Sequence, residues 1–339
     1  MISVHMTTFR RLRSGLLSRA VESVLAQTYR NFEFIICDDA SADGSSDYLA
    51  SVSAGDSRVK IIRNPKNVNS VAISLARCFK QADPSRNFIS WMFDDCTLEP
   101  HAFEVLMKRA SDTDAEFVFG ITRVHNKDGS TILVGDQSAA SIRDKIDTSS
   151  IVVPNGALLL TRSVFDKVGW YDSNIILRRS CDWDLFRRII HSGCLFEPIP
   201  KILMDEFGGL QNDSLRNSFT TTFEIMAKYA ALRDRVGFDI SVDAILNAPV
   251  DFIPPGQWSP DELMLIYAMF VEYYLSIGNV ARAYVWAEKL NARMTDKPFF
   301  LENLVACVKS RDTAQSLMAA GALAAGIYWA FKETRVRHT

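Results

Sequence analysis

The sequence predicts an α/β fold with a largely parallel sheet, followed by an all-α region. Through the first hundred residues, short β-rich runs alternate with segments whose apolar residues recur at helical spacing. Because this alternation forms βαβ units with right-handed crossovers, we expect parallel strands. From about residue 215 the strand signals fade and long amphipathic stretches follow. The 339 residues suffice for roughly two domains, which we place at 1–214 and 215–339.

Strands and helices are expected to alternate strictly before residue 100. The first helix carries apolar residues at positions 17, 20, 21, 24 and 25, which share one helical face. Strands are short runs bounded by polar or glycine-containing turns. The expected strands span 2–6, 32–37, 59–63 and 88–93, and the expected helices span 16–28, 45–53 and 70–81.

The pattern is less regular after residue 100. Helices are expected at 102–111 and 182–191, strands at 116–122 and 157–161, a hairpin turn at 125–130 and a polar loop at 142–150. Farther on, helices at 262–277 and 281–294 turn at Gly278 and Asn279. A packed helical hairpin explains this pair. A single tetratricopeptide hairpin is the alternative, although such repeats need neighbours to be stable.

Composition excludes several classes of protein. The formal net charge is −2, so the chain lacks the basic field that grips a nucleic-acid backbone, and we expect no nucleic-acid partner. The six cysteines form no CxxC pair, and no cysteine–histidine set has zinc-site spacing. The chain opens on a strand-like run without a secretory signal. These features together predict a cytoplasmic protein with reduced thiols.

One segment near the C-terminus could contact a membrane. Residues 317–331 are apolar and rich in alanine and glycine, and a basic tail follows. About 15 residues is short for a membrane span, which needs roughly 20. A buried terminal helix and an interfacial helix with a basic flank both fit, so peripheral membrane contact through 317–337 is one expectation. The helical region could equally form a homodimer or bind another protein.

Two acidic pairs follow two of the expected strands. Asp38 and Asp39 end the second strand, and Asp94 and Asp95 end the fourth. Ligands of parallel α/β sheets sit at the carboxyl ends of strands, so the two pairs should converge on one crevice. Clustered carboxylates repel one another unless a cation lies between them, which predicts a divalent-cation site. Turn or helix-cap chemistry is the alternative for each pair alone.

Four ordered blocks of the sequence carry a family resemblance. They are SVLAQTY at 23–29 with FEF at 32–34 and DDASADG at 38–44; ISWMFDDCTLEP at 89–100; NGA at 155–157 continuing to CDWDL at 181–185; and FGGL at 207–210. Together they resemble family 2 glycosyltransferases, which implies the GT-A fold, a Rossmann-like mixed sheet of nucleotide-diphospho-sugar transferases. The resemblance covers roughly residues 1–215.

The chain departs from the family pattern at two positions. Many members carry Asp-x-Asp at the metal-binding strand end, whereas Phe93 precedes Asp94 here. The Asp-Asp-x4-Pro spacing is similar to that of the spore-coat polysaccharide transferase type, which also lacks the first aspartate. The usual Glu-Asp of the acceptor region is Cys181-Asp182 here, which puts acceptor contacts in doubt.

The resemblance implies roles for individual residues. Asp182 matches the catalytic base, with a helix N-cap as its alternative role. Asp95 would bind Mn²⁺ or Mg²⁺, and Asp94 would hold the ribose or a metal-bound water. The implied nucleotide-sugar contacts are Thr7, Thr8, Asp39, Asp94, Arg13 and Arg63, and the implied acceptor region contains Asn155, Gly156, Trp183, Gly208 and Gly209.

An inverting glycosyltransferase is therefore the leading hypothesis. It would move a sugar from a nucleotide-diphosphate sugar, with a UDP-sugar as the expected donor, to a glycan or lipid-linked acceptor in bacterial surface polysaccharide synthesis. A nucleotidyltransferase would typically open with a glycine-rich loop, but 7–15 contain three arginines and a single glycine. A catalytically inactive binding or scaffold protein on the same fold is the second alternative. Retention of Asp39, Asp95 and Asp182 argues against it.

Overall fold

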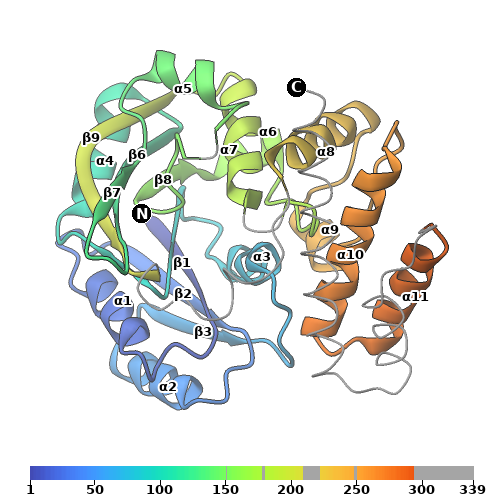
Figure 1. Ribbon diagram of the computed structural model, residues 1–339. Helices are drawn as coiled ribbons and strands as arrows, with labels where there is room; N and C mark the ends of the chain where they lie inside the picture. The colour runs from blue at the N-terminus through green and yellow to red at the C-terminus, as the bar shows by residue number, and fades with distance from the viewer. Residues whose placement is uncertain (150, 178–179, 209–221, 248–249, 294–339) are drawn as a thin grey trace. The chain divides into compact units, whose positions relative to one another are not determined.

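A computed structural model describes residues 1–149, 151–177, 180–208, 222–247 and 250–293 of the chain (Figure 1). These residues fall into two compact units. The first comprises 1–149, 151–173, 180–208 and 239–247, and the second comprises 174–177, 222–238 and 250–293.

The first unit opens with four parallel strands. Their order in the sheet is β3-β2-β1-β4, and β1 pairs in parallel with both β2 and β4. The strands are β1 (Ile2–Thr8), β2 (Phe32–Asp38), β3 (Val59–Arg63) and β4 (Phe88–Phe93), and the helices between them are α1 (Leu16–Leu25), α2 (Ser45–Gly55) and α3 (Val71–Gln81). The alternation predicted from the sequence is therefore confirmed.

The same sheet continues through strands of mixed direction. Its order extends as β4-β8-β6-β9-β5, with β7 paired to β6. Figure 1 shows β9 (yellow) as a long curved strand, which runs parallel to β6 and antiparallel to β5. The strands are β5 (Cys96–Leu98), β6 (Phe117–His125), β7 (Thr131–Val134), β8 (Leu158–Thr161) and β9 (Phe196–Glu206), and the helices are α4 (Ala102–Thr113), α5 (Ala139–Lys145), α6 (Arg162–Val168), α7 (Cys181–His191) and α9 (Val242–Asn247).

One expectation in this part of the chain was wrong. The sequence predicted a polar loop at 142–150, but α5 occupies 139–145. Ser138 caps this helix by accepting a hydrogen bond from the Ser141 amide, and Ile142 is buried beneath it. A single apolar anchor and a cap are enough for a short helix, and neither gives a periodic signal.

Strands β1 and β2 of the first unit are buried on both faces, as parallel strands covered by helices are. Alternate residues of β2 contact different clusters: Phe34 and Ile36 lie with the apolar residues of α1, α2 and α4, whereas Ile35 and Cys37 lie with Cys78 of α3. Leu17, Val21 and Val24 of α1 are at most 1% exposed. Burying each such side chain stabilises the fold by about 1.5–3 kcal/mol, so this layered core fixes the positions of the strand ends.

The described part of the second unit is helical. It contains α8 (Phe223–Val236), α10 (Pro260–Ser276) and α11 (Val280–Asn291). Ser259 and Glu262 form a capping box at the start of α10, and Gly278 adopts a φ of 72° in the turn before α11. The predicted helical hairpin is therefore confirmed.

Among the residues that the structure describes, no helix has the length and apolar character needed to cross a membrane. The segment 317–337, for which the sequence suggested membrane contact, lies outside the described residues, as does Gly209.

Candidate functional site

The candidate site lies where the parallel strands of the first unit end. The register places Thr8 opposite Asp38 of β2 and Thr7 opposite Phe93 of β4. Thr8 donates from its hydroxyl to Asp94 Oδ2 over 2.7 Å, and its carbonyl accepts from the Asp39 amide at 2.9 Å. The two acidic pairs that the sequence predicted to converge are thus joined through Thr8.

Asp94 is buried with incomplete compensation of its charge. Its Oδ2 also accepts from the Phe9 amide at 3.3 Å, and the Arg11 guanidinium lies 3.8 Å from Oδ1. Burial and the neighbouring Asp95 carboxylate nevertheless raise the pKa of Asp94 to about 7, against the opposing effects of Thr8, Arg11 and the Phe9 amide. A cation beside this pair would therefore be stabilised by the negative charge.

Asp95 is half-buried and lies against the segment that follows β9. The Phe207 amide donates to the Asp95 carbonyl at 2.8 Å, and the Cys96 thiol donates to Asp95 Oδ1 at 3.5 Å. A Cβ added to Gly208 would come within 2.2 Å of Asp95 Oδ2. Gly208, expected in the acceptor region, is thus brought next to the expected metal ligand, and a larger residue there would displace the Asp95 carboxylate.

The residues present fit a cation held largely by substrate. Within the described ranges, no three His, Cys, Asp or Glu side chains cluster closely enough to form a metal site on their own. Mg²⁺ typically binds one or two carboxylates together with substrate phosphates and water, and rarely an all-protein cage. Asp95 can supply the carboxylate of such a site, and the neighbouring Asp94, whose charge is incompletely compensated, would favour a cation there.

Asp39 holds the loop after β3. Its Oδ1 accepts from Asn64 Nδ2 at 2.8 Å and from the Val68 amide at 2.9 Å, and its Oδ2 accepts from the Asn69 amide at 3.0 Å. Asn64 is fully buried and also donates to Ser74 Oγ at 3.2 Å. Sequence reasoning missed Asn64, although a polar residue directly after a parallel strand is the signal that selected the others.

The two arginines that were expected to contact the nucleotide differ in their surroundings. Arg63 donates to the Ser41 carbonyl at 3.0 Å and to the Ser46 hydroxyl, and lies 3.8 Å from Asp38 Oδ2. This guanidinium therefore braces the loop after β2. Arg13 is exposed in the loop after β1, and Thr7 is half-buried at its strand end.

Asp182 occupies the first turn of α7. Ser180 is the N-cap of this helix, so the alternative role of Asp182 as N-cap is wrong. Burial raises the pKa of Asp182 to about 7, the Trp183 amide and its own amide oppose this, and the Glu206 carboxylate adds to it. A carboxyl group with a pKa near neutrality suits general-base catalysis.

Neighbouring buried charges fix the orientation of α7. Asp184 is fully buried and accepts from Arg188 Nε at 2.9 Å. Arg188 Nη2 in turn donates to the Trp170 carbonyl at 2.8 Å. The start of α7, with Asp182, is thereby tied to the segment that precedes it.

Of the remaining acceptor-region residues, Trp183 and Gly156 are buried and Asn155 is half-buried. Trp183 is 1% exposed and donates from Nε1 to the Ile146 carbonyl at 2.6 Å, so it packs in the core and offers no surface to an acceptor. A Cβ at Gly156 would meet the Met204 side chain at 2.5 Å, so Gly156 is needed for packing. Asn155 Oδ1 accepts from Trp91 Nε1 at 2.8 Å and from the Tyr171 hydroxyl at 3.1 Å.

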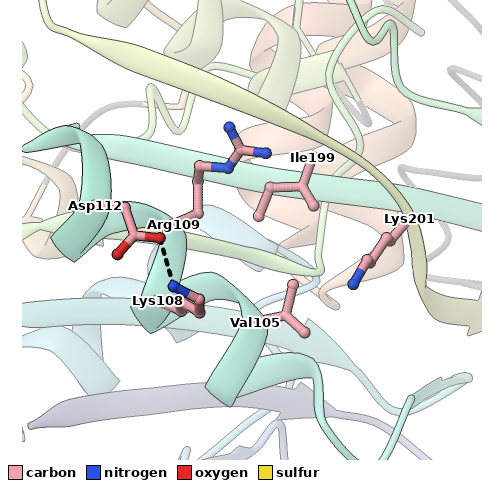
Figure 2. Close-up of a pocket in the computed structure, with 6 residues that line it drawn as sticks. All are labelled: Val105, Lys108, Arg109, Asp112, Ile199 and Lys201. Atoms are coloured by element: carbon pink, nitrogen blue, oxygen red, sulfur yellow. Dashed lines mark hydrogen bonds and ion pairs between the residues drawn. The ribbon is translucent and has the colours of Figure 1, made fainter.

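A separate hollow of about 360 Å³ lies between α4 and β9. Figure 2 shows the side chains of α4 on one side of it and those of β9 on the other, with Lys108 bonded to Asp112. Its β9 residues, Ile199 and Lys201, lie several residues before Glu206 at the end of the strand. It is lined by Val105, Lys108, Arg109, Asp112, Ile199 and Lys201, none of which contributes to the site at the strand ends.

Comparison with known proteins finds relatives in sequence and in fold. A chondroitin synthase of Pasteurella multocida (strain Pm70) is 25% identical over 209 residues, which are 60% of this chain but 20% of that protein. S. aureus TarS 1-349 in complex with UDP-GlcNAc superposes with a TM-score of 0.53 at 10% identity, covering 96% of this chain and 92% of that one. The mannosyltransferase PcManGT from Pyrobaculum calidifontis, in complex with GDP-Man and Mn²⁺, superposes with a TM-score of 0.50 at 12% identity, covering 96% and 85%.

The fold shared with these structures is the GT-A fold. The model of the family "Glycosyl transferase family 2" matches residues 3–169, which contain both acidic pairs and the strands that carry them. This part of the chain, residues 3–169, is therefore a glycosyl transferase family 2 region.

Proposed function

We propose that the protein is an inverting, divalent-cation-dependent glycosyltransferase. It transfers a sugar from a nucleotide-diphosphate sugar, with UDP-sugars as the first candidates, to a hydroxyl group of its acceptor. The observation that carries the proposal is the convergence of two carboxylates on the end of β9. Asp95 lies against Gly208, and Asp182 is close enough to Glu206 for that charge to raise the Asp182 pKa.

The two carboxylates have environments that suit different tasks. Asp182, with its pKa raised to about 7, would accept the proton of the attacking hydroxyl. The acceptor oxygen then bonds to the anomeric carbon as the bond to the diphosphate breaks, and this single displacement inverts the configuration. Asp95 would hold Mn²⁺ or Mg²⁺, whose charge stabilises the departing diphosphate.

Residues around the strand ends would bind the nucleotide. Asp39 and Thr7 would face the base, with Asp39 kept in place by Asn64. Asp94 would orient the ribose or a metal-bound water. Arg13 is exposed in the loop after β1, where its guanidinium could reach a phosphate. The complexes of TarS with UDP-GlcNAc and of PcManGT with GDP-Man and Mn²⁺ support this choice of ligands.

The acceptor is proposed to be a glycan or lipid-linked saccharide of bacterial surface polysaccharide synthesis. The similarity to a chondroitin synthase supports a polysaccharide product. We place the reaction on the cytoplasmic face of the membrane, with peripheral contact through 317–337. A homodimer through the helical region is compatible with this arrangement.

The principal test measures nucleotide diphosphate released from UDP-, GDP- and TDP-sugars in the presence of Mn²⁺. We expect slow hydrolysis of one donor, abolished by EDTA and by Asp182→Asn. Asp47→Asn, which alters an exposed carboxylate in the first turn of α2, is the matched control and should retain activity. Tight Mn²⁺-dependent binding of a donor that stays intact with every acceptor tried would favour the scaffold alternative. Absence of any nucleotide binding would overturn the proposal.

A further inference from the structure

Phe207 contacts a histidine and an arginine side chain from distant parts of the first unit. The His125 imidazole stacks on its ring with centroids 4.6 Å apart and planes 11° apart. The Arg19 guanidinium of α1 lies 4.3 Å from the ring centroid. Stacking and cation–π contacts of this kind each restrict the ring to one position. We call His125, Phe207 and Arg19 the aromatic clamp.

The His125 side of the clamp is itself fixed. Asp205 Oδ1 accepts from Arg123 Nε at 2.6 Å and lies 2.6 Å from His125 Nε2, and its Oδ2 accepts from Arg123 Nη2 at 2.9 Å. A bidentate guanidinium–carboxylate pair is among the most geometrically specific polar contacts. The imidazole therefore presents a fixed face to the Phe207 ring.

Phe207 is linked directly to Asp95. Its amide donates to the Asp95 carbonyl at 2.8 Å, which extends the pairing of β5 with β9 by one more bond. The next residue, Gly208, has its Cα against Asp95 Oδ2, where a Cβ would lie 2.2 Å away. A displacement of Phe207 therefore moves both the backbone and the carboxylate environment of Asp95.

We propose that Phe207 is a positioning residue, which acts through Asp95 to set the affinity for a cation-bound nucleoside diphosphate. The inference rests on the proposed function, because it assigns Asp95 to the cation. Nothing in the clamp needs to touch substrate. Its role is to hold the Asp95 carboxylate where it can bind the same cation as the diphosphate oxygens.

The test is calorimetric binding of UDP and GDP to the full chain, with Mn²⁺ and with EDTA. We expect Phe207→Leu, which keeps apolar volume but loses the stacked ring, to weaken Mn²⁺-dependent binding about tenfold or more. Phe207→Tyr, which keeps the ring, should restore affinity to within about twofold. A tenfold loss of affinity corresponds to a loss of roughly 1.4 kcal/mol in binding free energy.

Two further variants separate positioning from general stability. Arg19→Gln removes the exposed half of the clamp and should weaken binding. Arg143→Gln is its matched control, because Arg143 is also exposed and lies over a phenylalanine ring, that of Phe196 at the other end of β9, at 4.7 Å. Arg143→Gln should bind as the wild type does. Arg19→Gln also keeps the inference testable if Phe207→Leu does not fold.

A double-mutant cycle with Asp95→Asn decides whether Phe207 acts through Asp95. If it does, Phe207→Leu adds little further loss in the Asp95→Asn background. Additive losses, or wild-type affinity in both Phe207→Leu and Arg19→Gln, would overturn the inference while the proposed function stands. Failure of the wild type to bind any nucleoside diphosphate with Mn²⁺ would overturn both.

Discussion

Replacing Asp182 with asparagine should reduce activity and, above neutral pH, stabilise the protein. Burial raises the pKa of this carboxyl from 3.8 to about 7. At 1.36 kcal/mol per pKa unit, the folded state loses at most roughly 4 kcal/mol at alkaline pH by keeping Asp182 ionised. Asparagine carries no charge and avoids that penalty. Loss of a first-turn anion costs about 0.3–1 kcal/mol, which offsets part of the gain.

The direction of this pH dependence follows from the number of protons that the folded and unfolded states bind. Between about pH 4 and pH 7 the folded state holds a proton on Asp182 that the unfolded state has released, so wild-type stability falls as pH rises. Above pH 7 both states are ionised and this contribution is constant. The stability advantage of Asp182→Asn over the wild type should therefore grow by roughly 3 kcal/mol between pH 5 and pH 8.

Urea unfolding at pH 5 and pH 8, followed by the fluorescence of the buried tryptophans Trp91, Trp170 and Trp183, measures this difference. Asp47→Asn is the control, because it removes a first-turn carboxylate that is exposed, and its advantage should not change with pH. Parallel pH dependence in Asp182→Asn and the wild type would refute the reasoning. The same variant should lose about 10²–10⁴-fold in kcat if Asp182 is the base.

Four other predictions concern single side chains. The kcat/KM of the wild type should fall about tenfold per pH unit below pH 7, as Asp182 becomes protonated, and a profile that stays flat to pH 5 would contradict this. Asp39→Ala removes three hydrogen bonds to a charged acceptor and should cost about 2–4 kcal/mol in urea unfolding, with faster proteolysis of the loop after β3. Gly208→Ala places a Cβ 2.2 Å from Asp95 Oδ2 and should weaken Mn²⁺-dependent nucleotide binding about tenfold, with unchanged binding counting against the site. Trp183→Phe loses a buried hydrogen bond and should cost about 1–2 kcal/mol while leaving the KM for donor unaltered; a raised KM with native stability would instead mean substrate contact.

Local sequence determined most of the first hundred residues. Each strand and helix there shows its own periodicity, and short connections between alternating elements allow few arrangements. The polar residues after the strands were therefore identifiable, since parallel strands bring their carboxyl ends to one edge. Thr8, Asp39 and Asp94 meet there as expected.

The tertiary structure alone decided what each of these side chains does. Arg63 braces the loop after β2, because the Ser41 carbonyl and the Ser46 hydroxyl accept its hydrogen bonds. Trp183 is in the core because Ile146, distant in sequence, supplies an acceptor for its indole N–H. Such pairings depend on the packing of segments far apart in the chain, which no local pattern encodes.

The end of β9 shows the same division. The block FGGL at 207–210 was recognisable in the sequence. The 11-residue strand before it was not predicted, because Pro198 and Pro200 interrupt the alternating pattern typical of a strand. Only the folded sheet, in which β9 pairs with both β6 and β5, brings Phe207 and Gly208 against Asp95. The residue types of the site were thus set by local sequence, and their distances were set by pairing between strands that lie far apart in the chain.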